Sequence, residues 1–462
     1  MKKHINAYHL TAILSICLIW LSTSSCESLI EIDLPTNQIN SQEVFKDISI
    51  ARNALTGLYT NVREESLFTG KISGMGTLLS LYTDELVSNV EANSKIGINE
   101  FYTNTLLPSN NQLALVWNNS YKHIYSINSF IYGLTNSKYI DEQSKKTLLA
   151  EAYFLRALYY HYLCQLFGDI PYVTSIDYNN NTKIKKTTYL EVLNLIEADL
   201  LNAIDFIETE FHKNKYYPNK SNVLLLLAKN YLLKEDYIKA GITAKELLSI
   251  PNIEIEKDPL KTFKKNASST LWQLDKNSPT TYTYEADNFS FKTFPPSLTL
   301  SNHILSIFTN DDLRKSAWIN QVHKNNLTLY HSYKYKNINN NTDENSIVFR
   351  VEEAYFILAE AYIYQDKPQL AIQILNTIKQ RANTNTLSEN LDKQQIITEL
   401  LKELQREFFT EQGHRFFDLK RNGKLSLLES TKPNWSMKNS LLPIPEKELL
   451  LNPNLLPQNN GY

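Results

Sequence analysis

Glycine is scarce in this chain of 462 residues, and its charges are almost balanced. With only 11 Gly, the chain is unlike proteins that build glycine-rich phosphate-binding loops or many tight β-turns. Its 47 Lys and Arg nearly cancel its 49 Asp and Glu. The chain therefore lacks the excess positive charge that binds the phosphate backbone of a nucleic acid, and we do not expect a nucleic-acid partner. The remaining composition, 42% hydrophobic and 11% aromatic, is enough for a sizeable core and excludes global disorder. The scarcity of glycine favours helices.

Sequence motifs for catalysis or metal binding are missing as well. The chain contains no HExxH, GxSxG, CxxC or GxxxxGK[ST] pattern, and its nine His are scattered without ligand spacing. A catalytic triad can be assembled from residues at any spacing, so the missing motifs do not exclude one. We expect a protein that is not an enzyme and that uses neither a cofactor nor a metal ion.

The N-terminus has the pattern of a bacterial lipoprotein signal. Two Lys precede an apolar run at residues 10–21, which is shorter than the ~20 residues that a membrane-spanning helix needs. Small polar residues follow, and then Cys26, whose thiol we expect to be acylated. We therefore predict a signal peptide over 1–25 and a lipid anchor and tether over 26–42. An ordinary secretory signal with an incidental Cys is the alternative.

Apolar residues recur at helical spacing through most of the chain, and one string of five residues occurs twice. LAEAY occupies 149–153 and 358–362, and 227–231 keeps its Leu-Ala-x-x-Tyr frame. Small Ala lets two antiparallel helices approach closely while Leu and Tyr fill the space between them, as in tetratricopeptide repeats. Because the copies are unevenly spaced, we predict helix pairs separated by insertions and not a regular solenoid.

The helical periodicity also sets the expected boundaries of the helices. The predicted helices cover residues 43–63, 111–134, 145–167, 188–209, 221–234, 236–249, 350–365, 368–382 and 391–412. Residues 66–110 and 251–349 lack this period and are predicted to be largely irregular. Irregular segments of that length in a folded domain are usually either functional or disordered.

The densest cluster of charged and aromatic residues lies at 406–421, with the sequence REFFTEQGHRFFDLKR. We predict a helix that is closed by Gly413 and followed by a short second helical turn, with the Phe side chains inside. Gly413 forms the turn of this corner. The residues that could form charge-assisted contacts across it are Arg406, Glu407, Glu411, Arg415, Asp418 and Arg421. We favour a buried polar corner that holds two helices over a charged binding cleft.

Several segments, in this order along the chain, resemble the SusD/RagB family of outer-membrane nutrient-uptake lipoproteins. The segments are Cys26 with EIDLP, AEAYFLRALYY with LFGDIPYV, IEADL, RVEEAYFILAEAY, REFFTEQGHRFFDLKR, and a C-terminal LPIP, NPNL and QN series. They run from residue 26 to the C-terminus. The chain differs from many family members at Gln412, which stands between Glu411 and Gly413 where those members have Glu followed directly by Gly. We expect this residue to change only the packing of the corner.

The resemblance implies an all-α scaffold of about four tetratricopeptide-like helix pairs with minor β-structure. It also implies a SusC-like TonB-dependent transporter as partner, no catalytic activity, and an outer-membrane location, lipid-anchored and facing the cell surface. We expect one SusD-like domain over 43–462, with an N-terminal helical part at 43–250, an irregular ligand face at 251–349 and a C-terminal part at 350–462.

Capture of oligosaccharides for the transporter is the function that the resemblance implies, and peptide capture or a non-catalytic tetratricopeptide adaptor are the alternatives. Sugar sites use aromatic rings that stack on the apolar face of a pyranose, with amides and carboxylates for the hydroxyl groups. The candidates of these types are Tyr82, Asp84, Trp117, Trp272, Tyr282 and Trp318. For each ring, packing in the core is the competing interpretation.

Overall fold

The computed structural model describes most of the chain from residue 41 onward. The residues it does not describe are 1–40, 92–96, 209–214, 291–293, 295 and 325. The predicted signal peptide and Cys26 therefore lie outside the described residues. The chain divides into two units, Met1–Val44 and Phe45–Tyr462. Within the first unit, the described part is the short helix α2 (Ser41–Val44).

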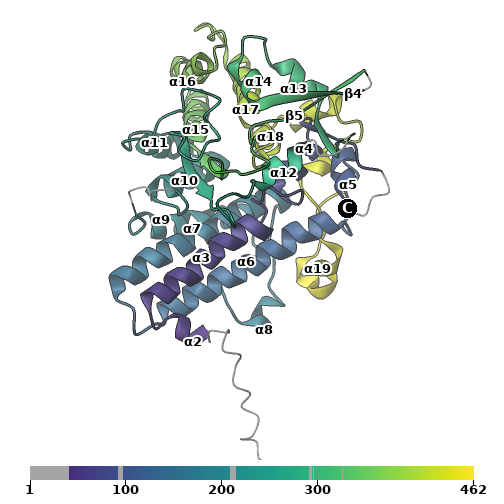
Figure 1. Ribbon diagram of the computed structural model, residues 1–462. Coiled ribbons are helices and arrows are strands. Elements are labelled where there is room, and N and C mark those ends of the chain that lie inside the picture. The colour runs from purple at the N-terminus through teal and green to yellow at the C-terminus, as the bar shows by residue number, and fades with distance from the viewer. Residues whose placement is uncertain (1–40, 92–96, 209–214, 291–293, 295, 325) are drawn as a thin grey trace, which may run out of the picture. The chain divides into compact units, whose positions relative to one another are not determined.

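Helices dominate the unit Phe45–Tyr462, which confirms the mainly all-α prediction (Figure 1). The helices up to residue 250 are α3 (Ile48–Glu65), α4 (Met75–Tyr82), α5 (Ile98–Thr103), α6 (Asn111–Thr135), α7 (Glu142–Phe167), α8 (Tyr178–Asn181), α9 (Tyr189–Ile204), α10 (Lys220–Leu233) and α11 (Tyr237–Leu248). Those after residue 250 are α12 (Tyr284–Phe289), α13 (Asn302–Ile307), α14 (Leu313–Trp318), α15 (Val351–Tyr364), α16 (Pro368–Arg381), α17 (Lys393–Phe408), α18 (His414–Arg421) and α19 (Glu446–Leu451). Every helix predicted from periodicity is present.

Side-chain caps explain where several of these helices begin. Asp47 accepts from the backbone N–H groups of the first turn of α3, Asn110 does the same for α6, and Asp141 for α7. These side chains satisfy backbone donors that have no partner inside the helix. The prediction placed the start of the first helix at residue 43, and the cap at Asp47 moves it to Ile48.

Consecutive helices pack as antiparallel pairs whose contact faces carry small residues. Helix α7 packs on α9, α10 on α11 and α15 on α16, and α11 also packs on α15. Ala228, Ala240, Ala361 and Ala371, which come from the repeated strings and their partner helices, are buried at these contacts. A Cβ atom added at Gly241 would lie only 3.4 Å from the Cβ of Ala361. This close approach is consistent with tetratricopeptide-like pairs.

Three antiparallel pairs of strands are present among the described residues. The strands are β1 (Leu86–Ser88) with β3 (Leu298–Leu300), β2 (Thr270–Leu274) with β6 (Ser346–Arg350), and β4 (Ile319–Lys324) with β5 (Leu327–Ser332). The first two pairs join segments far apart in the chain, with Leu86 opposite Leu300 and Thr270 opposite Arg350. Because α15 follows β6 directly, the second pair fixes residues 251–349 to the helical scaffold.

The region 66–110 is more ordered than predicted. Helix α4 (Met75–Tyr82) has seven buried side chains out of eight residues. A helix that is buried on nearly every side shows no alternation of apolar and polar faces, so the periodicity could not reveal it. No helix among the described residues combines the length and apolarity required to cross a bilayer.

The C-terminal segment after α18 folds back along the scaffold in short turns. Its elements are the 3-10 helices η2 (Leu425–Ser430), η3 (Met437–Ser440) and η4 (Pro453–Leu455), together with α19. The Asn459 side-chain amide donates to the backbone carbonyls of Phe167 and Leu442, at 2.9 and 2.7 Å. These bonds hold the tail beside the C-terminal end of α7.

The corner at 408–421 differs from the prediction in its backbone. Helix α17 ends at Phe408, and Gly413 is the N-cap of α18, not the closing residue of the preceding helix. Thr410, Gln412 and Gly413 all have left-handed backbone, with φ of 60°, 44° and 72°. A Cβ atom on Gly413 would overlap the Leu79 side chain, so glycine is required here for both conformation and space.

We expect Gly413→Ala to lower the free energy of unfolding more than Gly423→Ala. Gly423 has a similar φ of 63° but nothing within 4 Å of an added Cβ atom, so its replacement isolates the backbone cost of about 1–2 kcal/mol. Gly413→Ala adds overlap with Leu79, which raises the expected loss to roughly 3 kcal/mol. Urea denaturation of both variants measures the difference, and equal losses would contradict the steric requirement.

Candidate functional site

The family-motif residues at 408–421 lie inside the protein and pair with charges from distant segments. The Arg415 guanidinium donates to both carboxylate oxygens of Asp84, at 3.0 and 2.8 Å. Burial raises the pKa of Asp84, but the charge and hydrogen bonds of Arg415, together with the nearby His303, leave this pKa below its ordinary value. Arg421 donates to both oxygens of Glu360 at 2.7 Å and to Asp418 at 2.8 Å. These contacts join α18 to α15 and to the segment after α4.

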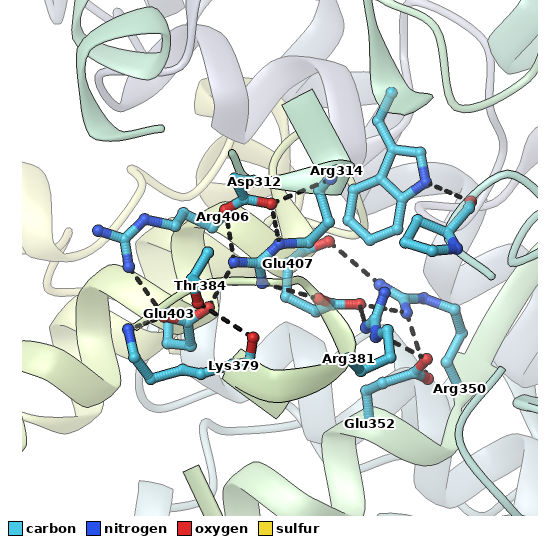
Figure 2. A network of polar contacts seen from close by, with 12 residues as sticks. Asp312, Arg314, Arg350, Glu352, Lys379, Arg381, Thr384, Glu403, Arg406 and Glu407 are labelled. Atoms are coloured by element: carbon cyan, nitrogen blue, oxygen red, sulfur yellow. Dashed lines mark hydrogen bonds and ion pairs between the residues drawn. The ribbon is translucent and has the colours of Figure 1, made fainter. Parts of the chain in front are cut away.

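A second charged cluster lies between α14, α15, α16 and α17 (Figure 2). The fully buried Arg314 donates to Glu407 at 3.0 Å and to Glu403 at 2.5 Å. Glu407 also accepts from Arg350 at 2.9 Å and from Arg381 at 2.6 Å. Burial opposes ionisation of Glu407, but its three guanidinium partners hold the pKa well below the ordinary range. Glu407 therefore remains charged and links four segments of the scaffold.

The carboxylates of this second cluster are engaged with guanidinium groups, which suits a structural role. The Glu403 carboxyl is buried, yet Arg314, Arg406 and Lys379 lower its pKa to about 2. A catalytic acid or base needs a pKa near the working pH, and the pKa of Glu403 lies well below that. Within the described part of the chain, no group of three or more His, Cys, Asp or Glu residues is arranged to hold a metal ion.

Four of the six residues proposed as ligand contacts lie in the core. Tyr82, Trp272 and Trp318 have 0% of their surface exposed, and Asp84 has 3%. The indole N–H of Trp272 donates to the Tyr216 carbonyl at 3.1 Å, and that of Trp318 donates to a backbone carbonyl at 2.7 Å. With no ring face open to a sugar, these aromatic residues take the core-packing role, and Asp84 holds the corner. The candidate site excludes all four.

Trp117, the fifth proposed contact, lies at an aromatic pocket of about 420 Å³. Its walls come from α6, from residues 171–184 including α8, and from α19 with the tail that follows. Figure 1 shows α8 and α19 below the long helix α6. The aromatic side chains that line the pocket are Trp117, Tyr121, Tyr125 and Tyr178. The polar side chains that line it are Asn118, Asn181, Thr182, Glu448 and Asn452.

Helical spacing places three of these rings in one stripe. Trp117, Tyr121 and Tyr125 are four residues apart on α6 and therefore share a face. The Trp117 and Tyr121 ring centroids lie 4.8 Å apart, and the Tyr121 hydroxyl donates to the Pro171 carbonyl at 2.9 Å. Trp117 is 2% exposed and forms the base, whereas Tyr125 and Tyr178 are 48% and 76% exposed at the rim. The pocket thus offers two accessible ring faces over a fixed aromatic base.

Hydrogen bonds between distant segments hold the other two walls in place. The Asn452 and Asn454 side chains each donate to a backbone carbonyl of the 171–187 segment at 2.8 Å, to Ile184 and Lys183 respectively. Asn128 on α6 donates to the Val173 carbonyl, also at 2.8 Å. Because side chains on the tail and on α6 both bind this segment, the pocket does not depend on a single loop contact.

The stripe on α6 could have been found in the sequence, but the rest of the pocket could not. Aromatic residues at i, i+4 and i+8 are visible at 117, 121 and 125, and of these Trp117 is among the predicted ligand contacts. Tyr178 and Glu448 lie far from α6 in the chain and carry no motif. Tertiary folding brings them together.

Tyr282, the sixth proposed contact, lies at a separate hollow of about 160 Å³ and is 41% exposed. Arg63, Asn277 and Tyr284 also line this hollow. The Tyr284 hydroxyl donates to Glu64 at 2.5 Å, and its ring lies under the Lys71 ammonium group. The Tyr284 ring is engaged in this way and the hollow is smaller, so it offers less stacking surface than the aromatic pocket.

The protein is thus a scaffold of paired helices that carries an aromatic pocket. Residues 30–232 match the family model described as SusD-like, starch-binding and associating with the outer membrane, and residues 307–462 match the SusD family model. The two matches together cover more than half of the chain. The chain belongs to the SusD family, as its sequence motifs predicted.

Relatives and solved structures agree with this assignment. SusD-like protein P2 of Formosa agariphila is 25% identical, over 93% of this chain and 95% of the relative. A SusD superfamily protein from Bacteroides vulgatus has a TM-score of 0.77 at 20% identity, over 90% of this chain and 100% of its own. Surface glycan-binding protein A from Bacteroides thetaiotaomicron, in complex with laminarihexaose, has a TM-score of 0.74 at 18% identity, over 89% and 99%. The structural likeness at these identities is one of fold.

Proposed function

We propose that this protein captures oligosaccharides at the outer membrane and delivers them to a SusC-like TonB-dependent transporter. The observation that carries the glycan part is the aromatic pocket, which combines exposed rings with amide, hydroxyl and carboxylate groups. The laminarihexaose complex of a structural neighbour supports the same class of ligand. Family membership supports delivery to an outer-membrane partner.

Attachment to the membrane through an acylated Cys26 belongs to the same proposal. The family model is described as associating with the outer membrane. A lipid on Cys26 would hold the body at the cell surface through the tether predicted at residues 26–42.

The shape of the pocket favours a glycan over the two alternatives. A peptide is usually held along its backbone, in an extended cleft or at a sheet edge, whereas this pocket is short and aromatic. A tetratricopeptide adaptor would bind its partner on the helix pairs themselves. Here two of the three walls are the 171–184 segment and the C-terminal tail.

A binding panel tests the proposed function directly. We expect the purified mature protein to bind at least one class of oligosaccharide in isothermal titration calorimetry, and not to bind unstructured peptides of similar mass. Bovine serum albumin run through the same titrations gives the baseline for non-specific heats. Binding of peptides alone would favour the RagB-like alternative, and binding of neither class would contradict capture.

A further inference from the structure

We propose that the aromatic pocket selects a sugar unit without anionic groups, and that Glu448 and the tyrosine faces exclude carboxylated and sulfated units. This inference rests on the proposed function and adds the charge class of its ligand. It follows from the charges that line the pocket, from the cations around it and from the electronic character of its rings.

The first argument is the charge of the lining. Glu448 is the one charged residue among the described residues that line the pocket, and none of them is Lys or Arg. Proteins that bind carboxylate, sulfate or phosphate groups place Arg or Lys against them, often in bidentate geometry. A unit with an anionic group would find no such partner here and would face a carboxylate in a partly desolvated space, where like charges repel strongly.

The second argument concerns cations near the pocket. Lys122, beside Tyr121 in the sequence, forms an ion pair with Glu65 at 3.0 Å. The Lys186 ammonium group donates to the Pro457 carbonyl at 2.7 Å. Neither side chain lines the pocket. Both cations therefore have contacts of their own outside it, and the Glu448 charge is not balanced within the lining.

The third argument is the chemistry of the walls. The faces of Tyr125 and Tyr178 carry partial negative charge, which attracts the slightly positive C–H groups of a pyranose and disfavours an anion. Burial raises the pKa of Glu448, because part of its hydration is lost. Sugar hydroxyl groups can restore those hydrogen bonds by donating to the carboxylate. Stacking and hydrogen bonding thus favour the same uncharged ligand.

The test compares neutral and anionic oligosaccharides of equal length on the purified mature protein. The neutral probes are gluco-, manno-, xylo- and galacto-oligosaccharides, and the anionic probes are oligogalacturonates and sulfated galacto-oligosaccharides. We expect a neutral probe to bind and each anionic probe to bind at least about tenfold more weakly, a difference of ~1.4 kcal/mol. Calorimetry at low and at physiological ionic strength gives both affinities.

Three variants connect the result to the pocket. Tyr178→Ala should weaken binding of the neutral probe about tenfold or more by removing a stacking face. Tyr139→Ala is the matched control, because Tyr139 is 69% exposed and lies outside the pocket, and it should change nothing. Glu448→Gln removes the repelling charge, so the ratio of neutral to anionic affinity should fall about tenfold in this variant.

The outcomes separate this inference from the proposed function. Neutral binding that Tyr178→Ala leaves intact overturns the pocket assignment, while glycan capture stands. Anionic binding that is tighter than neutral binding and is lost in Tyr178→Ala overturns the charge preference alone. If no oligosaccharide of either class binds, the proposed function fails and the inference fails with it.

Discussion

Glu407→Ala is expected to lower the free energy of unfolding by roughly 3–5 kcal/mol, the cost of breaking a buried ion pair. The substitution would remove a carboxylate that Arg314 and Arg381 share, in sites where their side chains are 0% and 5% exposed. Arg314 would keep Asp312 and Glu403, but among the described residues Arg381 would keep only the longer ion pair with Glu352 at 3.7 Å. Three guanidinium groups converge on this one carboxylate in Figure 2, so its loss affects four segments together. Urea denaturation followed by far-UV circular dichroism measures the change.

Glu399→Ala is the matched control for this prediction. Glu399 lies on the same helix, α17, and pairs with Lys402 at 2.9 Å near the surface. Exposed pairs of this kind contribute about 0–1 kcal/mol, so the control should unfold nearly as the unaltered protein does. A loss below about 1 kcal/mol for Glu407→Ala would show that the cluster adds little to stability.

Cys26→Ala is expected to move the protein almost completely from the membrane fraction to the aqueous fraction. The physical reason is that the acyl chains, each contributing about 0.8 kcal/mol per buried CH₂ group, would be the membrane attachment in the proposed arrangement. The unit Phe45–Tyr462 does not include Cys26, so its unfolding transition should be unchanged. Cell fractionation with immunoblotting measures the partitioning.

Cys164→Ala provides the comparison for the lipidation test. Cys164 is a free, fully buried thiol on α7, so its replacement should leave membrane retention intact. It should cost some stability through the small cavity that it creates. Membrane retention of the Cys26→Ala variant would mean that another part of the protein attaches it to the membrane.

The helical scaffold was predictable because its signals are local. Small residues recur in the LAEAY strings on α7 and α15 and in the related string on α10. At this spacing they lie on one face only if the segment is a helix. Their burial in the structure follows from that spacing. Helix α4 was not predicted, because burial on nearly all sides removed the periodic pattern on which the method depends.

The sequence could not show which of the aromatic ligand candidates line a pocket. Trp272, Trp318 and Trp117 are chemically alike in the sequence, and all three are almost fully buried. Trp117 lines the aromatic pocket, because residues 171–184 and the tail close around α6. An aromatic residue suits a core and a sugar site equally well, so composition could not distinguish them.

The sequence by itself determined the family, the helix pairs and the expectation of a lipid-bearing Cys26, since each depends on residues that are neighbours along the chain or in one helix. Only the tertiary structure decided which rings are open, which charges neutralise one another and which carboxylate faces the pocket. Those properties arise between residues hundreds of positions apart, as with Tyr125 and Glu448. Their exposure and electrostatics depend on the packing that surrounds them.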